Sequence, residues 1–317
     1  MKISIGRQHA SFGETHRCKF CRWFGLSRQG GWSTVALLIA VTITCSGSSA
    51  ARGIGSAKGQ ETEIPFNLYN GNLIIVKATI GSVKNVNVIL DTGTSPTAIN
   101  LSVADRLNVR GKPALLQTLN GTIQVQTVTL PNIQIGPLHA GSIAGVVEDL
   151  TFLERSLGIS LGGIAGLDIL RASSFVIDYR RHKIIFGPIA AGEKAVHFET
   201  QIPYLSVKAK IAGQQVRLLV DSGTAGLLVY RNRLRSTVEQ LHIDPNASIS
   251  TTSGGGTHLR WLSTEVSLGK GSLGAHNVAI ADVNSDPQDD FDGLLGLATM
   301  GFRKVSFDFD NGLFGWD

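Results

Sequence analysis

Two short runs of the chain hold an aspartate in the same setting: Ile89-Leu90-Asp91-Thr92-Gly93-Thr94 and Leu219-Val220-Asp221-Ser222-Gly223-Thr224. In each run an apolar, strand-like stretch ends at the aspartate, and a hydroxyl residue and a glycine follow it. Two carboxyl groups that matching frameworks hold close together cannot both ionise cheaply, so the pair can share one proton. Such a pair can supply a general acid and a general base at one site. The two runs therefore predict a paired-carboxylate site at Asp91 and Asp221.

A single Asp-Ser/Thr-Gly sequence is typical of an ordinary turn, but here the surroundings are repeated as well. Gly166, in Gly-Ile-Ala-Gly-Leu, follows Asp91 by 75 residues, and Gly296, in Gly-Leu-Leu-Gly-Leu, follows Asp221 by the same interval. The chain thus contains an internal repeat of roughly 130 residues that runs from about residue 62 to the C-terminus. Because there are two copies, the repeat predicts two pseudo-symmetric lobes rather than a solenoid.

Asp178 and Asp308 repeat as faithfully as the first pair of aspartates. They lie in strand-turn patterns, before Arg180-Arg181 and Asp310-Asn311-Gly312 respectively. We therefore expect a structural role for Asp178 and Asp308.

Short strands must position the paired aspartates. Alternating and continuous apolar runs predict hairpins that end at Asp91 and Asp221, formed by residues 73–80 with 86–90 and by 204–211 with 216–220. A further hairpin is expected at Asn120-Gly121, with a glycine-rich counterpart around Gly254, and we place Gly121 and Gly254 at the tips. Helices are expected over 102–107 and 231–241. With few helical patterns and 37 glycines, the sequence predicts a mainly β fold.

The composition excludes an electrostatic argument for nucleic-acid binding. The formal charge of +5 arises in residues 1–50, which hold six Lys and Arg side chains against one Glu, whereas the rest of the chain has 23 basic and 23 acidic residues.

Residues 1–50 combine a basic segment, an apolar run and small residues, which is typical of a secretory signal peptide or an N-terminal anchor. We expect an exported protein, periplasmic or extracellular, that is free or held at the membrane by this segment. All three cysteines lie in the same segment.

These features divide the chain into four parts. Residues 1–50 form the signal peptide or anchor and 51–62 a flexible linker. Residues 63–190 form an N-terminal lobe and 198–317 a C-terminal lobe, with the connection between them within 187–200.

The repeated Asp-Thr/Ser-Gly-Thr loops, together with the repeated apolar-apolar-Gly element (Ile164-Ala165-Gly166 and Leu294-Leu295-Gly296), resemble aspartic proteases of the pepsin and retropepsin type. The resemblance covers nearly all of residues 62–317. The lobe size and the Gly-Leu-Asp-Ile-Leu…Ile-Asp-Tyr-Arg-Arg ending look most like bacterial retropepsin-like proteins, here with two lobes fused in one chain. The resemblance implies a bilobal fold of two pseudo-twofold-related β-barrel lobes with a cleft between them.

The resemblance also implies roles for the matching residues. Asp91 and Asp221 would form the catalytic dyad, and Thr92 and Ser222 would cross-bond at its base. The remaining supporting positions are those that allow a tight turn, donate to the carboxylates or let the loops pass through the frame: Gly93, Gly223, Thr94, Thr224, Gly166 and Gly296. Because hydroxyl donors favour the ionised dyad, Thr94 and Thr224 predict an acid-leaning pH profile.

The expected activity is that of an aspartic endopeptidase, in which a water activated by the shared-proton dyad attacks a peptide bond. The resemblance implies a peptide or protein substrate in an extended conformation. We expect no cofactor, no metal, no nucleic acid and no second subunit at the active site. The alternative is a catalytically silent peptide-binding protein on the same fold.

An acidic run from Asp282 to Asp292 does not fit a calcium-binding loop, because Pro287 and Gly293 stand where that loop needs Gly and Glu.

Overall fold

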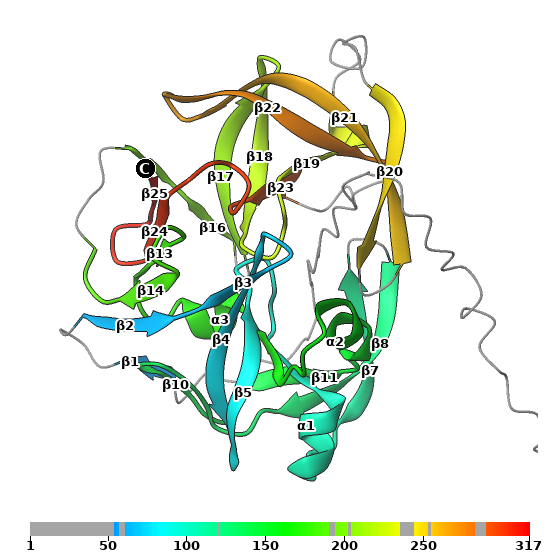
Figure 1. Ribbon diagram of the computed structural model, residues 1–317, viewed down its shortest axis with the longest axis vertical. Helices are drawn as coiled ribbons and strands as arrows, with labels where there is room; N and C mark the ends of the chain where they lie inside the picture. The colour runs from blue at the N-terminus through cyan, green and yellow to red at the C-terminus, as the bar shows by residue number, and fades with distance from the viewer. Residues whose placement is uncertain are drawn as a thin grey trace, which may run out of the picture. The chain divides into compact units, whose positions relative to one another are not determined.

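The computed structural model describes residues 54–56, 61–118, 121–189, 194–201, 204–234, 244–252, 255–282 and 290–317. All of them belong to one compact unit, Thr34–Asp317. They form three β-sheets, which confirms the expected mainly β fold (Figure 1). The expected leader, residues 1–50, lies outside the described residues.

An eleven-stranded sheet forms the first lobe, with the strand order β1-β10-β9-β4-β5-β12-β6-β11-β8-β7 and with β3 paired to β4. Three short helices accompany it: α1 (Leu101–Arg106), α2 (Thr151–Leu157) and α3 (Leu167–Leu170). Its strands in chain order are β1 (Ile54–Ser56), β3 (Asn67–Tyr69), β4 (Leu73–Ile80), β5 (Val83–Leu90), β6 (Ala98–Asn100), β7 (Lys112–Thr118), β8 (Gly121–Thr129), β9 (Ile133–Ile135), β10 (Leu138–Ala140), β11 (Ala144–Glu148) and β12 (Gly163–Ala165).

An eight-stranded sheet forms the second lobe, with the order β16-β17-β18-β23-β19-β22-β21-β20. Because β17 also pairs with β21, six of these strands close into a barrel. The long β21–β22 hairpin stands out in Figure 1. The elements are β16 (Glu199–Gln201), β17 (Tyr204–Ile211), β18 (Gln214–Asp221), β19 (Leu227–Tyr230), the 3-10 helix η2 (Arg231–Arg233), β20 (Asp244–Thr252), β21 (Gly255–Leu268), β22 (Gly271–Ala281) and β23 (Gly293–Gly296).

The first strand of each hairpin that ends at an aspartate, β4 or β17, is half-buried, and its sequence shows why. Leu-Ile-Ile-Val-Lys-Ala-Thr-Ile of β4 and Tyr-Leu-Ser-Val-Lys-Ala-Lys-Ile of β17 bury their first four residues, and Lys77 and Lys208 then face solvent. Beyond that point burial alternates, as expected where one face of a sheet meets solvent. The turns that follow use left-handed backbone conformations, at Gly81 in the first lobe and at Ala212-Gly213 in the second.

A six-stranded sheet is built from both copies of the repeat, in the order β15-β25-β24-β13-β14-β2. Its central pair, β13 and β24, joins the two copies with Phe175 opposite Phe307, and these two rings stack with centroids 4.7 Å apart. Both rings are fully buried in the main hydrophobic core. The strands are β2 (Thr62–Pro65), β13 (Phe175–Asp178), β14 (Lys183–Phe186), β15 (Lys194–His197), β24 (Lys304–Asp308) and β25 (Leu313–Trp316).

Asp178 and Asp308 close equivalent turns in this sheet. The Asp178 carboxylate accepts the Arg181 N–H at 2.9 Å, and the Asp308 carboxylate accepts the Asn311 N–H at 3.0 Å. An Asp that binds the backbone a few residues on is a common way to stabilise a turn. The repetition of these two residues thus has a structural cause, as the sequence indicated.

Several expected segments differ in detail. Residues 54–56 of the expected flexible linker form strand β1, which pairs with β10, and the connection within 187–200 contains β15 and most of β16. Of the expected helix over 231–241, residues 231–233 form a single 3-10 turn, and 235–241 lie outside the described residues. Helix α2 was not expected.

The expected tip of the first-lobe hairpin also differs. Thr118 pairs with Gly121, so Gly121 is the first residue of β8 rather than the tip. In the second lobe Thr252 pairs with Gly255. The expected tip residue Gly254 lies outside the described residues.

Candidate active site

The two Asp-Thr/Ser-Gly loops begin at equivalent places in the two lobes. Strand β5 ends just before Asp91 and pairs in parallel with β12, with Leu90 opposite Ala165. Strand β18 ends at Asp221 and pairs in parallel with β23, with Asp221 opposite Gly296. The apolar strands thus deliver both aspartates at the same point of equivalent sheets. Both side chains are completely buried.

The structure brings the two carboxyl groups together. Asp91 and Asp221 lie close enough to alter each other's pKa. Glycines 93 and 223 each lie against the carboxyl group of the opposite loop. Asp91 and Asp221 therefore form one site, although they are 130 positions apart in the sequence.

Each carboxyl group also receives donors from its own loop. Asp91 Oδ1 accepts the Gly93 N–H at 2.8 Å, and its Oδ2 accepts the Thr94 hydroxyl at 2.8 Å. Such short bonds from donors that need no rearrangement favour a carboxylate over a neutral carboxyl group.

The Asp221 side has the same two donors and one more. Asp221 Oδ1 accepts the Gly223 N–H at 2.7 Å and the Thr224 N–H at 3.1 Å, and Oδ2 accepts the Thr224 hydroxyl at 2.6 Å. In the first loop the corresponding Thr94 N–H is directed to the main-chain oxygen of Asp91 at 3.4 Å. The two loops are therefore similar but not identical.

Burial dominates the electrostatics of the pair. It raises the pKa of Asp91, against the hydrogen bonds from Thr94 and Gly93 that lower it. Burial also raises the pKa of Asp221 well above its ordinary value, and the charge of Asp91 raises it further. Two buried carboxyl groups in contact cannot both be ionised at low cost, so the pair retains a proton to a higher pH than either group would in water.

Thr92 and Ser222 bond across the two loops. Each hydroxyl accepts the backbone N–H of the other residue at 3.0 Å. The Thr92 hydroxyl also donates to the Val220 carbonyl at 2.9 Å, and the Ser222 hydroxyl donates to the Leu90 carbonyl at 3.1 Å. These four buried bonds tie the loop of one lobe to the loop of the other.

Gly166 and Gly296 lie behind the loops, where a side chain has no room. A Cβ on Gly166 would be 2.5 Å from the Thr94 carbonyl oxygen, and one on Gly296 would be 2.4 Å from the Thr224 carbonyl oxygen. Both distances are far below ordinary contact, so each loop passes over a backbone that must lack a side chain.

Sequence reasoning missed two features of this region. The Asn72 amide donates to the Gly223 carbonyl at 2.6 Å, and the Asp168 carboxylate accepts the backbone N–H and the hydroxyl of Thr97 at 2.9 and 2.7 Å. The repeat marks neither of them, because Pro203 corresponds to Asn72, and Leu227 and Ala298 correspond to Thr97 and Asp168. Burial is the main cause that raises the pKa of Asp168.

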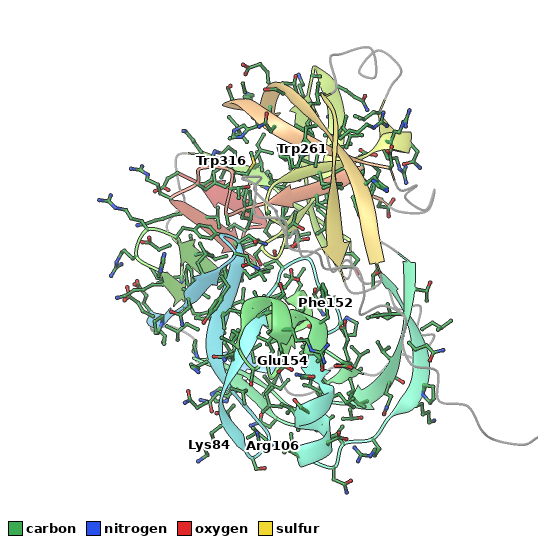
Figure 2. The ribbon with its side chains drawn as sticks, turned by 45° about the vertical axis from the view of Figure 1, so that its right-hand side comes forward. Lys84, Arg106, Phe152, Glu154, Trp261 and Trp316 are labelled. Atoms are coloured by element: carbon green, nitrogen blue, oxygen red, sulfur yellow. The ribbon has the colours of Figure 1, made fainter. Side chains whose placement is uncertain are left out.

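Helix α2 and the segment after it support β12, which carries the chain to Gly166. Figure 2 labels Phe152 and Glu154 on this helix. The Glu154 carboxylate accepts the Leu161 N–H at 2.8 Å, and the Asn100 amide donates to the Leu161 carbonyl at 2.9 Å. Phe152 is one of the exposed large apolar side chains, with 46% of its surface accessible.

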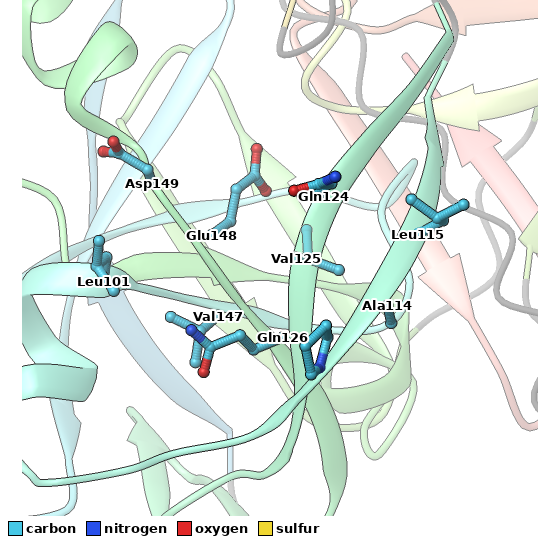
Figure 3. A pocket seen from close by; sticks show the side chains of 10 residues that line it. Leu101, Ala114, Leu115, Gln124, Val125, Gln126, Val147, Glu148 and Asp149 are labelled. Atoms are coloured by element: carbon cyan, nitrogen blue, oxygen red, sulfur yellow. The ribbon is translucent and has the colours of Figure 1, made fainter. Parts of the chain in front are cut away.

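A separate pocket of about 490 Å³ lies in the first lobe, beside the β7–β8 hairpin and the end of β11 (Figure 3). Glu148, which is buried, and Asp149 give it an acidic rim. The pocket is distinct from the paired carboxyl groups. Its lining consists of Leu101, Pro113, Ala114, Leu115, Gln124, Val125, Gln126, Val147, Glu148 and Asp149.

Asp282, the first residue of the acidic run considered for metal binding, bonds to arginines instead. Its carboxylate contacts Arg231 at 3.1 Å and Arg260 at 2.7 Å. Within the described ranges, His, Cys, Asp and Glu side chains do not gather in groups of three or more that could hold a metal ion. In the same part of the chain, none of the helices has the length and apolar character needed to span a membrane.

Comparison with known families gives two matches along the chain. The aspartyl protease family model matches residues 76–168 and again residues 207–299. The two matched segments are offset by 131 residues, and each contains one Asp loop and one apolar-apolar-Gly element. They confirm the two fused retropepsin-like units that the repeat indicated. A comparison with curated proteins returned no match. With more than half of its length matched, the chain belongs to the aspartyl protease family.

Proposed function

We propose that this protein is an aspartic endopeptidase in which Asp91 and Asp221 are the catalytic dyad. The observation that carries the proposal is the pair of fully buried carboxyl groups, each packed against the glycine of the opposite loop at the ends of equivalent strands. A buried carboxyl pair whose pKa values are raised is costly to fold, and such strongly perturbed groups cluster at functional sites. The family supports a protease function in general terms.

The chemistry follows from the shared proton. The ionised carboxylate takes a proton from a bound water while the water oxygen attacks the carbonyl carbon of the peptide bond. The protonated carboxyl group donates its hydrogen bond to the carbonyl oxygen, where negative charge develops. The C–N bond of the tetrahedral intermediate then breaks, and a proton passes from the dyad to the leaving amine. The pair ends the cycle with one proton, as it began.

The loop residues support this chemistry by fixing the carboxyl groups in advance. The bonds from Thr94 and Thr224 hold the outer oxygens at 2.8 and 2.6 Å, and the exchange between Thr92 and Ser222 holds the loops themselves. A dyad held in place loses little free energy to reorganisation when charge moves. Because one chain supplies both aspartates, no second subunit is needed to complete the pair.

We propose a peptide or protein substrate bound in an extended conformation. Extended peptides bind by adding backbone hydrogen bonds to strands, and the described part of the chain offers β7 and β20 as edge strands of their sheets. Each of these strands belongs to a hairpin that has the same place in its lobe.

The decisive experiment compares wild-type protein with Asp91→Asn and Asp221→Asn on a mixed peptide library between pH 3 and pH 7. We expect cleavage by the wild type and none by either variant, since Asn cannot carry the shared proton. Asp105→Asn is the matched control, because Asp105 is exposed and forms only a surface ion pair with Arg110. Equal cleavage by wild type and Asp91→Asn would disprove the dyad. Absence of cleavage together with peptide binding by the wild type would show a silent peptide-binding protein.

We also propose that the chain is exported, on the strength of the basic, apolar and small-residue pattern of residues 1–50. Expression of the full chain in a bacterial host, followed by N-terminal sequencing of the mature protein, tests this. A new N-terminus near residue 51 is expected. An intact Met1 in the membrane fraction would identify an anchor instead, and an intact Met1 in the cytoplasm would reject export.

A further inference from the structure

Asn72 connects the first lobe to the Asp loop of the second. It ends a tight turn in which Asn70 and Gly71 adopt positive φ angles, and its own N–H donates to the Tyr69 carbonyl at 3.1 Å. The turn directs a fully buried side chain toward Gly223, 151 residues further along the chain. There the Asn72 Nδ2 donates to the Gly223 carbonyl oxygen at 2.6 Å.

The Gly223 carbonyl shares a peptide group with the Thr224 N–H. That N–H donates to Asp221 Oδ1 at 3.1 Å, and the Gly223 N–H donates to the same oxygen at 2.7 Å. A peptide group whose oxygen accepts a hydrogen bond becomes a stronger donor through its N–H, because the two bonds polarise the group in the same sense. Asn72, the Gly223–Thr224 peptide and Asp221 therefore form one continuous chain of hydrogen bonds.

This support reaches one loop of the pair. The residue that corresponds to Asn72 in the second copy is Pro203, whose side chain has no donor. In the first loop the Thr94 N–H is directed to the main-chain oxygen of Asp91. The chain of hydrogen bonds thus makes the two carboxyl groups unequal, although the repeat that delivers them is symmetric.

The amide oxygen of Asn72, unlike the amide nitrogen, has no hydrogen-bond partner among the described residues although it is buried. A buried acceptor without a partner is unfavourable for folding. An apolar side chain of the same size would avoid that penalty but would leave the buried Gly223 carbonyl oxygen without its donor, so the bond to Gly223 is what the amide supplies at this position.

We propose that Asn72 is a positioning residue of the dyad: it fixes the Gly223–Thr224 peptide so that the Thr224 N–H supports the ionised form of Asp221. The assignment of the dyad as catalytic rests on the proposed function. The hydrogen-bond chain and its effect on the titration of the pair do not.

Two other titratable groups interact electrostatically with Asp221 and must be considered in any test. Asp91, from the opposite loop, raises the pKa of Asp221 and titrates together with it. Tyr179 follows β13 and has a buried hydroxyl; burial and the charge of Asp221 raise its pKa above the range of the experiment. A titration between pH 3 and pH 8 therefore reports on the dyad.

The test compares wild type with Asn72→Leu, which keeps the approximate size of the side chain and removes the donor. We expect the acid limb of the kcat/KM profile to move to higher pH by a few tenths of a unit to about one unit, since the ionised dyad loses support. Asn72→Ala, which adds no bulk, serves the same purpose if Asn72→Leu does not fold. An unchanged acid limb in an active variant would overturn the proposal.

Asn100→Leu is the matched control. Asn100 is also a buried asparagine whose Nδ2 donates to a backbone carbonyl, that of Leu161 at 2.9 Å, but this bond stays within the first lobe. We expect it to lower stability without moving the acid limb. If Asn100→Leu moves the limb as far as Asn72→Leu does, the effect is a general consequence of destabilisation and the proposal fails.

A measurement that does not need activity separates this proposal from the proposed function. The Asp carboxyl carbons of the full chain, labelled with carbon-13, are titrated by NMR in wild type and in Asn72→Leu. A higher dyad pKa in the variant supports the role of Asn72 even if the protein cleaves no peptide. Identical titrations, in a protein that does cleave peptides, would reject the role of Asn72 and leave the proposed function intact.

Discussion

Gly223 lies directly against the carboxyl group of Asp91: a Cβ on this glycine would be 2.7 Å from Asp91 Oδ2. The relationship is reciprocal, because a Cβ on Gly93 would be 2.4 Å from the carboxyl carbon of Asp221. Each glycine of the Asp-Thr/Ser-Gly loops therefore makes room for the carboxyl group of the other lobe. The glycine of each repeated tripeptide is therefore required for the two loops to meet.

Gly93→Ala should disable the site without unfolding the protein. The added methyl group must displace the Asp221 carboxyl, and a displacement of about 1 Å at a catalytic group can lower kcat/KM by about 100-fold. Peptide cleavage assays and far-UV circular dichroism on the same sample measure the two effects. Gly141→Ala is the control, because a Cβ there meets its nearest neighbour at an ordinary 3.6 Å. Near-normal activity in Gly93→Ala would show that the loops are not held as closely as described.

Thr92→Val should weaken the link between the lobes. Valine keeps the shape of threonine but removes the bond to the Val220 carbonyl and the acceptor for the Ser222 N–H. Losing two buried hydrogen bonds and leaving their partners unsatisfied is expected to lower the free energy of unfolding by about 2–4 kcal/mol. Urea denaturation measures it.

Thr129→Val provides the comparison, since Thr129 is an exposed strand residue and a surface change of this kind is usually worth within about 0.5 kcal/mol. Similar midpoints for Thr92→Val and Thr129→Val would contradict the idea that the exchange stabilises the junction. Thr92→Ser, which keeps the hydroxyl, should recover most of the loss.

The repeat allowed much of the site to be predicted from the sequence. Equal 75-residue intervals linked Asp91 to Gly166 and Asp221 to Gly296, and the structure shows the cause of that spacing: β12 and β23 pair in parallel with the strands that carry the aspartates. Apolar runs ending at the two aspartates fixed the hairpins in the same way. Local pattern and internal symmetry therefore specified the elements that deliver the carboxyl groups.

Asn72 could not be predicted in this way. It stands in a Tyr-Asn-Gly-Asn turn that has an ordinary local explanation, and its partner is 151 residues away. Its place against Gly223 depends on how the two lobes meet, which no local pattern encodes. Strands β15 and β16 were missed for a related reason, since their short polar sequences become strands only by pairing with β25 and β17.

Replacement of the two outer threonines should change the pH dependence of catalysis. The Thr94 and Thr224 hydroxyls donate to the outer oxygens of Asp91 and Asp221 and lower the pKa of both groups. In Thr94→Ala/Thr224→Ala the ionised dyad loses these donors, so its acid limb should move to higher pH and the acid preference should weaken. The kcat/KM profile measures the shift.

The double serine variant, Thr94→Ser/Thr224→Ser, is the control because it keeps both hydroxyls. Its profile should overlay that of the wild type. A profile that does not move in the double alanine variant would reject the role of the two hydroxyls in setting the pH range.

The dyad should also make the stability of the protein depend on pH. Burial raises the folded-state pKa of Asp91 and Asp221 above the ordinary value of 3.8, so in this range the folded protein holds protons more tightly than the unfolded chain does. The resulting contribution to stability is complete below about pH 3.8 and is lost as the pH rises through the folded-state values.

Asp221→Asn removes one of the two carboxyl groups and with it much of this dependence. The variant should therefore gain stability relative to the wild type as the pH is raised from 3 to 7, as measured by urea unfolding at each pH. Other carboxyl groups are common to both proteins and cancel in the difference. A difference between Asp221→Asn and wild type that is the same at pH 3 and pH 7 would mean that Asp221 titrates as an ordinary carboxyl group.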